Sequence, residues 1–168
     1  MSELTLAFVQ AALNAPVSTQ ADVATRIITD SREAKAGDVF VALVGEQFDG
    51  HDYVADVLAK GVVAVIVSRE VVAGDARQIV VADTLAALGQ VAQTWRLKWN
   101  PKIVALTGSN GKTTVKEMCA AILRTALGDD AVLATAGNFN NEIGMPLTLL
   151  RLQAAHKVFM MVSLMLMR

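Results

Sequence analysis

The residues best suited to chemistry are 107–114, whose sequence is TGSNGKTT. They lie between an apolar stretch that predicts a strand, 102–107, and an amphipathic stretch that predicts a helix, 113–127. Glycines in such a loop let backbone N–H groups converge on phosphate oxygens, a lysine adds positive charge, and a threonine hydroxyl can reach Mg²⁺. The segment predicts a nucleotide site formed by Gly108, Ser109, Asn110, Gly111, Lys112, Thr113 and Thr114.

This motif departs from the generic Walker A pattern at one position. Leu106 stands where that pattern has its first glycine. A purely structural turn is therefore the alternative. The strand, loop and helix context favours the nucleotide site.

A second polar segment, 137–144, has the sequence GNFNNEIG. Its amides and carboxylate would follow a predicted strand at 131–135, at the sheet edge where open α/β sheets bind ligands. The alternative is a turn built from asparagine, which tolerates left-handed backbone angles. Pro146 then suits the first turn of another helix.

Two further polar loops follow predicted strands near the N-terminus, at 30–32 and 45–51. Each is weak evidence by itself, because loops are generally polar. His51 is expected on the surface, at the start of a helix.

Composition limits the classes of protein to consider. The chain has 168 residues, a net charge of −1, 54% hydrophobic and 18% charged residues, and one cysteine. Balanced charge gives no electrostatic basis for binding nucleic acid or an anionic membrane, and the hydrophobic content excludes overall disorder. No apolar run reaches the roughly 18 residues of a membrane span, and a lone cysteine suits a reducing compartment. We expect a cytoplasmic protein.

The order of elements predicts an α/β fold with parallel sheets. Strands expected at 26–29, 38–44, 62–67 and 78–81 alternate with helical stretches, and Asp83 can cap a helix running to Trp99. Asn100 and Pro101 then break the chain before a second parallel sheet begins. We expect an N-terminal domain at 1–82, a linking helix at 83–100 and the start of another domain at 101–157.

Taken together, these motifs resemble the Mur ligases of peptidoglycan synthesis. The segments that carry the resemblance are, in order, TDSR (29–32), GDVFVAL (37–43), DGHDY (49–53), TGSNGKTT (107–114) and AGNFNNEIGMPLT (136–148). TGxxGKTT is typical of the Mur and folylpolyglutamate type of ATPase, which accounts for Leu106. The last segment points to the branch of the family that adds D-alanyl-D-alanine.

The resemblance implies an ATP-dependent ligase with three domains, of which this chain holds the UDP-sugar-binding one and the truncated opening of the ATPase. In the family, the γ-phosphoryl of ATP activates a carboxylate of UDP-N-acetylmuramoyl-tripeptide as an acyl phosphate. The amine of D-alanyl-D-alanine then displaces phosphate. The resemblance also implies that the protein is a monomer, with no nucleic-acid partner and no membrane-inserted segment.

The resemblance also assigns roles to residues of this sequence. Lys112 and Thr113 would act in catalysis, with Thr113 toward Mg²⁺. The phosphate loop, with Asn138 and Asn141, would bind ATP. The sugar nucleotide would contact Ser31, Arg32, Gly45, Glu46, Gln47, Phe48 and Asn140.

The C-terminal stretch 158–168 is rich in methionine and departs from the family pattern, which has a glutamate and glycines there. A buried strand would explain 158–162, but we interpret 158–168 as an aberrant tail and expect the chain to lack full activity. Two alternatives stay open. One is a non-catalytic fragment that binds sugar nucleotides, and the other is a small phosphate-loop kinase or NTPase.

Overall fold

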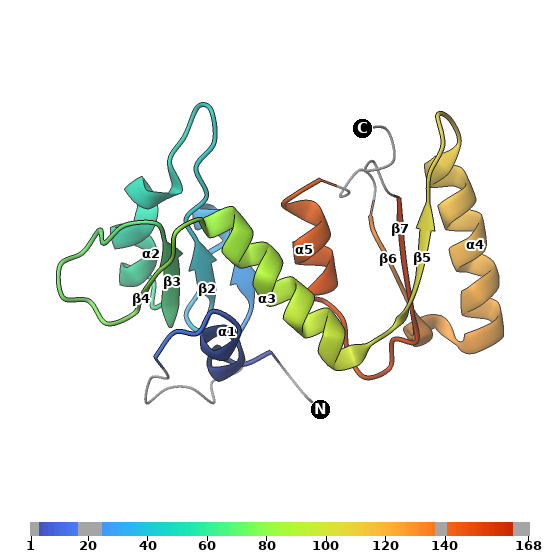
Figure 1. Ribbon diagram of the computed structural model, residues 1–168, viewed down its shortest axis with the longest axis horizontal. Coiled ribbons are helices and arrows are strands. Elements are labelled where there is room, and N and C mark those ends of the chain that lie inside the picture. Colours follow the sequence, from blue (N-terminus) through green and yellow to red (C-terminus); the bar gives the residue numbers. More distant parts are fainter. Residues whose placement is uncertain (1–3, 17–24, 137–140, 163–168) are drawn as a thin grey trace. The chain divides into compact units, whose positions relative to one another are not determined.

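The computed structural model describes residues 4–16, 25–136 and 141–162 (Figure 1). The chain divides into two compact units, Glu3–Val91 and a second unit from Ala92 onward. The division falls inside one long helix, α3 (Thr84–Trp99). Asp83 caps this helix as predicted, because its Oδ1 accepts from the N–H groups of Leu85 at 2.8 Å and Ala86 at 2.9 Å.

The first unit is built on a sheet of four parallel strands in the order β1-β2-β3-β4. The strands are β1 (Ile27–Ile28), β2 (Val39–Val41), β3 (Ala64–Val67) and β4 (Gln78–Val80). The helices of this unit are α1 (Leu6–Ala12), the 3₁₀ turns η1 (Ser31–Glu33) and η2 (Gly50–Tyr53), and α2 (Val54–Ala59). Because all four strands are parallel, their carboxyl ends meet at one edge of the sheet.

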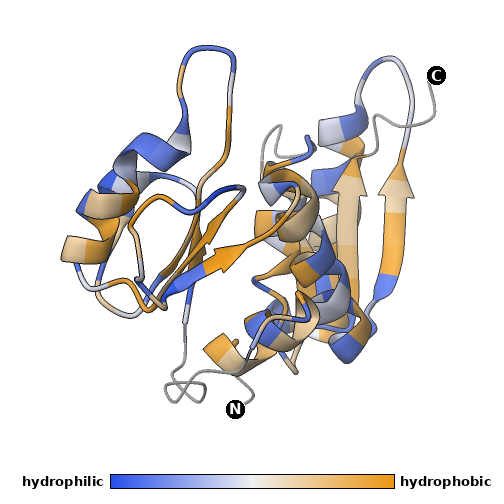
Figure 2. Ribbon diagram, turned by 60° about the vertical axis from the view of Figure 1, so that its left-hand side comes forward, coloured by the Kyte–Doolittle hydropathy of each residue, from blue (hydrophilic) through white to orange (hydrophobic). Residues whose placement is uncertain are grey.

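The strands β2 and β3 form the centre of this first sheet. All of their residues are buried, which is the pattern expected for a parallel sheet with both faces covered. The colouring by hydropathy shows these strands as hydrophobic (Figure 2). Their core partners come from α2 and the segments around it and include Val54, Val57, Leu58 and Val62.

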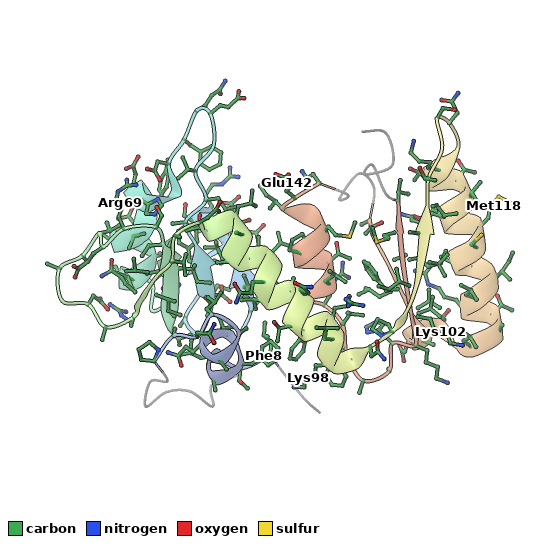
Figure 3. The ribbon with its side chains drawn as sticks, viewed as in Figure 1. Phe8, Arg69, Lys98, Lys102, Met118 and Glu142 are labelled. Atoms are coloured by element: carbon green, nitrogen blue, oxygen red, sulfur yellow. The ribbon has the colours of Figure 1, made fainter. Side chains whose placement is uncertain are left out.

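The second unit contains a three-stranded parallel sheet in the order β5-β7-β6. Its elements are β5 (Lys102–Leu106), α4 (Lys112–Leu127), η3 (Asp129–Ala131), β6 (Val132–Ala134), α5 (Gly144–Leu149) and β7 (Val158–Val162). One face of α4 packs on β6 and β7 through Ala120. Met118 lies on its outer face, 60% exposed (Figure 3).

The C-terminal stretch contains the strand β7, in agreement with the buried strand that the apolar pattern of 158–162 indicates. Its five residues, which we assigned to an aberrant tail, form the middle strand of the second sheet, with Leu106 opposite Val162. The physical reason is that an apolar run satisfies a central parallel strand whatever its exact sequence. The aberrant tail at 158–168 stays a prediction, and its residues 163–168 lie outside the described residues.

Two tryptophans hold the carboxyl-terminal half of α3 within the second unit. Trp95 is 2% exposed, and its Nε1 donates to the Leu152 carbonyl at 3.0 Å. Its ring meets that of Trp99 edge to face, with the ring centres 5.5 Å apart. Trp95 is therefore a core residue of this unit.

Gly50 is required by the close approach of two backbone segments. A Cβ at this position would lie 2.8 Å from both the nitrogen and the oxygen of Leu43. We expect Gly50→Ala to lower the free energy of unfolding of the first unit by about 1–3 kcal/mol, because backbone atoms must move apart. Urea denaturation measures this change.

Gly89→Ala is the matched control for this substitution. Gly89 lies inside α3, and a Cβ there would meet nothing within 4 Å. The change should stabilise the helix by about 0.5–1 kcal/mol. Equal effects of the two substitutions would contradict the steric argument.

Candidate functional site

The predicted phosphate loop connects β5 to α4, as the sequence indicates. Gly111 caps α4 with a left-handed φ of 76°, and Gly108 has a φ of 145°, so both positions favour glycine. Ser109 and Asn110 are exposed between them. The loop therefore brings the seven predicted residues 108–114 together at the carboxyl end of β5.

Lys112 folds back over this loop. Its ammonium donates to the carbonyl of Gly108 and lies 3.4 Å from the carbonyl oxygen of Ser109. The first internal bond of the helix runs from the Val115 N–H to the Gly111 carbonyl at 2.9 Å. The N–H groups of Lys112, Thr113 and Thr114 precede it, where a helix has no internal acceptors and its dipole is positive. Such an arrangement can bind phosphate oxygens.

For Mg²⁺, the described residues supply few oxygen ligands near this loop. The side chain of Thr113 is exposed at the start of α4. The neighbouring strand β7 ends in Met161 and Val162 and brings no carboxylate to this edge. No group of three or more His, Cys, Asp or Glu side chains suited to a metal occurs within 4–16, 25–136 or 141–162. Thr113 fits Mg²⁺ only in combination with nucleotide phosphates and water.

Sequence reasoning missed a second lysine of α4. Lys116 is fully buried, donates to the Thr135 carbonyl and lies 2.9 Å from Glu117 Oε1. Lys116 follows Lys112 by four residues, so both lie on one face of the helix. This spacing is the sequence feature that could have pointed to Lys116. Lys116 connects the first turns of α4 to Thr135, the residue after β6, which precedes the asparagine-rich segment 137–144.

That asparagine-rich segment is described only in part, since Asn138 and Asn140 lie outside the described residues. Asn141 Oδ1 accepts from the Gly144 N–H at 2.7 Å, close to the start of α5. Glu142 is exposed beside it (Figure 3). Asn141 thus has the local turn role that we left open as an alternative, and its contact with ATP stays a prediction.

A separate group of candidate residues lies at the carboxyl edge of the first sheet. Ser31 and Arg32 follow β1 in η1, where Arg32 forms an ion pair with Asp30 at 2.6 Å. Hydrogen bonds from Arg32 lower the pKa of the Asp30 carboxyl to about 2. Lys60 Nζ donates to the Ser31 carbonyl at 2.8 Å. The Arg32 side chain itself is 88% exposed.

At the same edge, the residues after β2 form a short hairpin, 44–49. The Gly45 N–H donates to the Phe48 carbonyl at 2.9 Å, and Val44 pairs with Asp49. The predicted contacts Gly45, Glu46, Gln47 and Phe48 form its exposed tip, which is largely hydrophilic in Figure 2. The parallel sheet therefore brings this hairpin and η1 to one edge.

Our expectation for His51 was wrong, because His51 is 1% exposed. Its Nδ1 lies 2.6 Å from Asp49 Oδ1, and its Nε2 accepts from the Ser68 N–H at 2.9 Å. Asp49 also accepts from Arg69 at 2.8 Å. These bonds connect the base of the hairpin to the end of β3.

Models of known families match both units. The Mur ligase family, catalytic domain, matches residues 24–96, and the Mur ligase middle domain matches residues 106–163. The second match includes the whole of β7. Within the described residues, no helix has the length and apolar character needed to cross a bilayer.

Curated relatives agree with these matches. The chain is 50% identical over 133 residues to UDP-N-acetylmuramoyl-tripeptide--D-alanyl-D-alanine ligase of Haemophilus influenzae, covering 79% of this chain and 29% of the relative. It is 49% identical over 126 residues to the enzyme of the same name from Escherichia coli, covering 75% and 27%. The chain thus spans less than a third of these relatives.

Solved structures share the fold. MurF from Acinetobacter baumannii matches with a TM-score of 0.84 at 40% identity over 97% of this chain and 36% of that one. MurF ligase from Thermotoga maritima, in complex with ADP, matches with a TM-score of 0.74 at 33% identity, covering 82% and 31%.

Proposed function

Because the chain belongs to the Mur ligase family, we propose that it is the sugar-nucleotide-binding and nucleotide-binding part of a UDP-N-acetylmuramoyl-tripeptide:D-alanyl-D-alanine ligase. The observation that carries the proposal is the 50% identity over 133 residues to a curated ligase of that name. In peptidoglycan precursor synthesis, such a ligase joins D-alanyl-D-alanine to the tripeptide of UDP-N-acetylmuramoyl-tripeptide in the cytoplasm.

In this proposal the phosphate loop binds ATP. The N–H groups at the start of α4 bind phosphate oxygens, and Lys112 turns from the loop carbonyls to the outer phosphates. Mg²⁺ neutralises phosphate charge when bound, and Thr113 is the residue that would contact it. The loop positions the γ-phosphoryl and stabilises its charge, which is most of what phosphoryl transfer requires of a protein.

The carboxyl edge of the first sheet would bind the UDP end of the sugar nucleotide. Ser31 and Arg32 follow β1, and the hairpin tip 45–48 follows the neighbouring strand β2. Phe48 is 56% exposed and offers a ring that can stack on uracil. Asn138, Asn140 and Asn141 would complete the nucleotide and substrate sites of the second unit.

A second candidate function is nucleotide binding without turnover. The observation that favours it is the end of β7, where Val162 faces Leu106 at the edge that carries the phosphate loop. Phosphate-loop enzymes generally hold Mg²⁺ with an acidic residue on a neighbouring strand. With valine there, we propose that the 168-residue chain binds its nucleotides but forms no amide.

Separate titrations of the whole chain with UDP and with ATP test both proposals. We expect two independent sites, because the candidate residues lie in different units. Isothermal titration calorimetry should detect each ligand in the presence of the other. Binding of ATP alone would favour a small kinase or NTPase, and amide formation from the two substrates would contradict binding without turnover.

A further inference from the structure

We propose that Arg69 is a further ligand-binding residue, which contacts the diphosphate of the uridine nucleotide. This inference rests on the proposed function, namely that the first unit binds the UDP end of a sugar nucleotide. Its basis is a closed ring of hydrogen bonds that holds the Arg69 guanidinium at the edge where the hairpin 44–49 leaves the sheet.

The ring starts at Ser68 and ends at the next residue of the chain, Arg69. The Ser68 N–H donates to His51 Nε2 at 2.9 Å, and His51 Nδ1 lies 2.6 Å from Asp49 Oδ1. Asp49 Oδ2 then accepts from Arg69 at 2.8 Å. Because the Ser68 N–H occupies the lone pair of Nε2, His51 carries its proton on Nδ1 and donates it to Asp49.

His51, the buried member of this ring of hydrogen bonds, makes the ring rigid. Its side chain is 1% exposed, and both imidazole nitrogens are hydrogen-bonded. The hydrogen bond from Arg69, followed by that from the His51 N–H, holds the pKa of the Asp49 carboxyl well below its usual range. Asp49 is therefore ionised at neutral pH and keeps its bond to Arg69.

The exposed end of the ring has binding capacity left. The Arg69 side chain is 57% exposed, and its hydrogen bond to Asp49 uses one of the five N–H donors of a guanidinium. A guanidinium is the side-chain group best matched to phosphate, because its donors can bind two oxygens together. A fixed and partly exposed arginine thus suits a diphosphate.

Its position agrees with this role. Arg69 follows β3 and the hairpin follows β2, and these two strands pair in parallel with Val41 opposite Ile66. Both segments therefore leave the sheet at the same edge, where Figure 3 shows Arg69. Asp49 belongs to the hairpin base and to the ring at once, so Arg69 is fixed relative to the hairpin.

Arg77 provides a matched control on the same unit. It is also paired with an aspartate, Asp75, at 2.6 Å, and its side chain is 39% exposed. Arg77 precedes β4, however, so it lies at the opposite edge of the sheet, and it donates to the Leu58 carbonyl there. A role in general stability would affect both arginines, whereas phosphate binding concerns Arg69 alone.

The experiment compares UDP with uridine on the whole chain, in wild type, Arg69→Gln, Arg69→Lys and Arg77→Gln. For Arg69→Gln we expect the Kd for UDP to rise about tenfold and the Kd for uridine to stay unchanged. The Kd of Arg69→Lys for UDP should lie between those of wild type and Arg69→Gln, because lysine keeps the charge but lacks the paired N–H donors of a guanidinium. Arg77→Gln should bind both ligands as wild type does.

Each contrary result has a distinct meaning. If both Arg69 variants bound uridine and UDP equally less tightly, the hydrogen-bonded ring would only hold the hairpin in place, and the proposal would be overturned. Unchanged UDP binding in both Arg69 variants would overturn it as well. If wild type bound neither uridine nor UDP, the proposed function of the first unit would itself be wrong. If Arg69→Gln fails to fold, Arg69→Lys decides.

Discussion

Lys112→Ala is expected to raise the Kd of the chain for ATP about 100-fold, because it removes the charged donor that we propose for the outer phosphates. Its ammonium already lies on the Gly108 carbonyl, within the turn of the loop where phosphates would bind. Loss of one or two charge-assisted hydrogen bonds, at about 1.5–3 kcal/mol each, accounts for a change of this size. Isothermal titration calorimetry with ATP and with ADP measures it.

Lys102→Ala is the matched control for this variant. Lys102 is an exposed lysine at the opposite end of the same strand, β5, so its removal changes the net charge equally but leaves the loop intact. Its Kd for ATP should equal that of wild type. UDP binding should be unchanged in both variants. ATP binding by Lys112→Ala at wild-type strength would refute the phosphate-loop assignment.

Trp95→Ala is expected to lower the free energy of unfolding of the second unit by about 3–5 kcal/mol, the usual cost of removing a buried tryptophan. Trp95 is 2% exposed, packs edge to face on Trp99 and donates to the Leu152 carbonyl. The substitution leaves a cavity and an unsatisfied carbonyl. Native-state hydrogen exchange of the β7 amides measures the change, because central strands exchange through global opening.

Two variants separate the contributions to this loss. Trp95→Phe keeps most of the packing and loses the hydrogen bond, so it should cost about 1–2 kcal/mol. Leu97→Ala removes a 56% exposed side chain from the same helix and should change stability by less than about 0.5 kcal/mol. If the β7 amides were equally protected from hydrogen exchange in Trp95→Ala and Leu97→Ala, Trp95 would not be part of the core.

The sequence predicted features that depend on local patterns. The phosphate loop, the Asp83 cap and the end of α4 at Gly128 follow from residues that are neighbours along the chain. The parallel strands follow from their alternation with helices. The strand predicted at 38–44 is shorter in the structure, β2 (Val39–Val41), and the chain turns into the hairpin from Val44 onward.

Features that depend on distant residues were not predicted. His51 is buried because its partner Ser68 lies 17 positions away, and Lys116 is buried against Thr135, 19 positions away. In the sequence alone, both look like ordinary polar residues of helices and loops. The central place of β7 was not predicted for a related reason, since it depends on pairing with both β5 and β6. Single-sequence patterns carry no information on which strands pair.

The edge-to-face pair of Trp95 and Trp99 makes the two units optically distinct. These are the two tryptophans of the whole chain, and both lie in the second unit, whereas the single tyrosine, Tyr53, lies in the first. Fluorescence excited selectively in indole therefore reports the second unit alone. A urea titration followed by indole emission and by far-ultraviolet circular dichroism would resolve two transitions if the units unfold independently, without any label being attached.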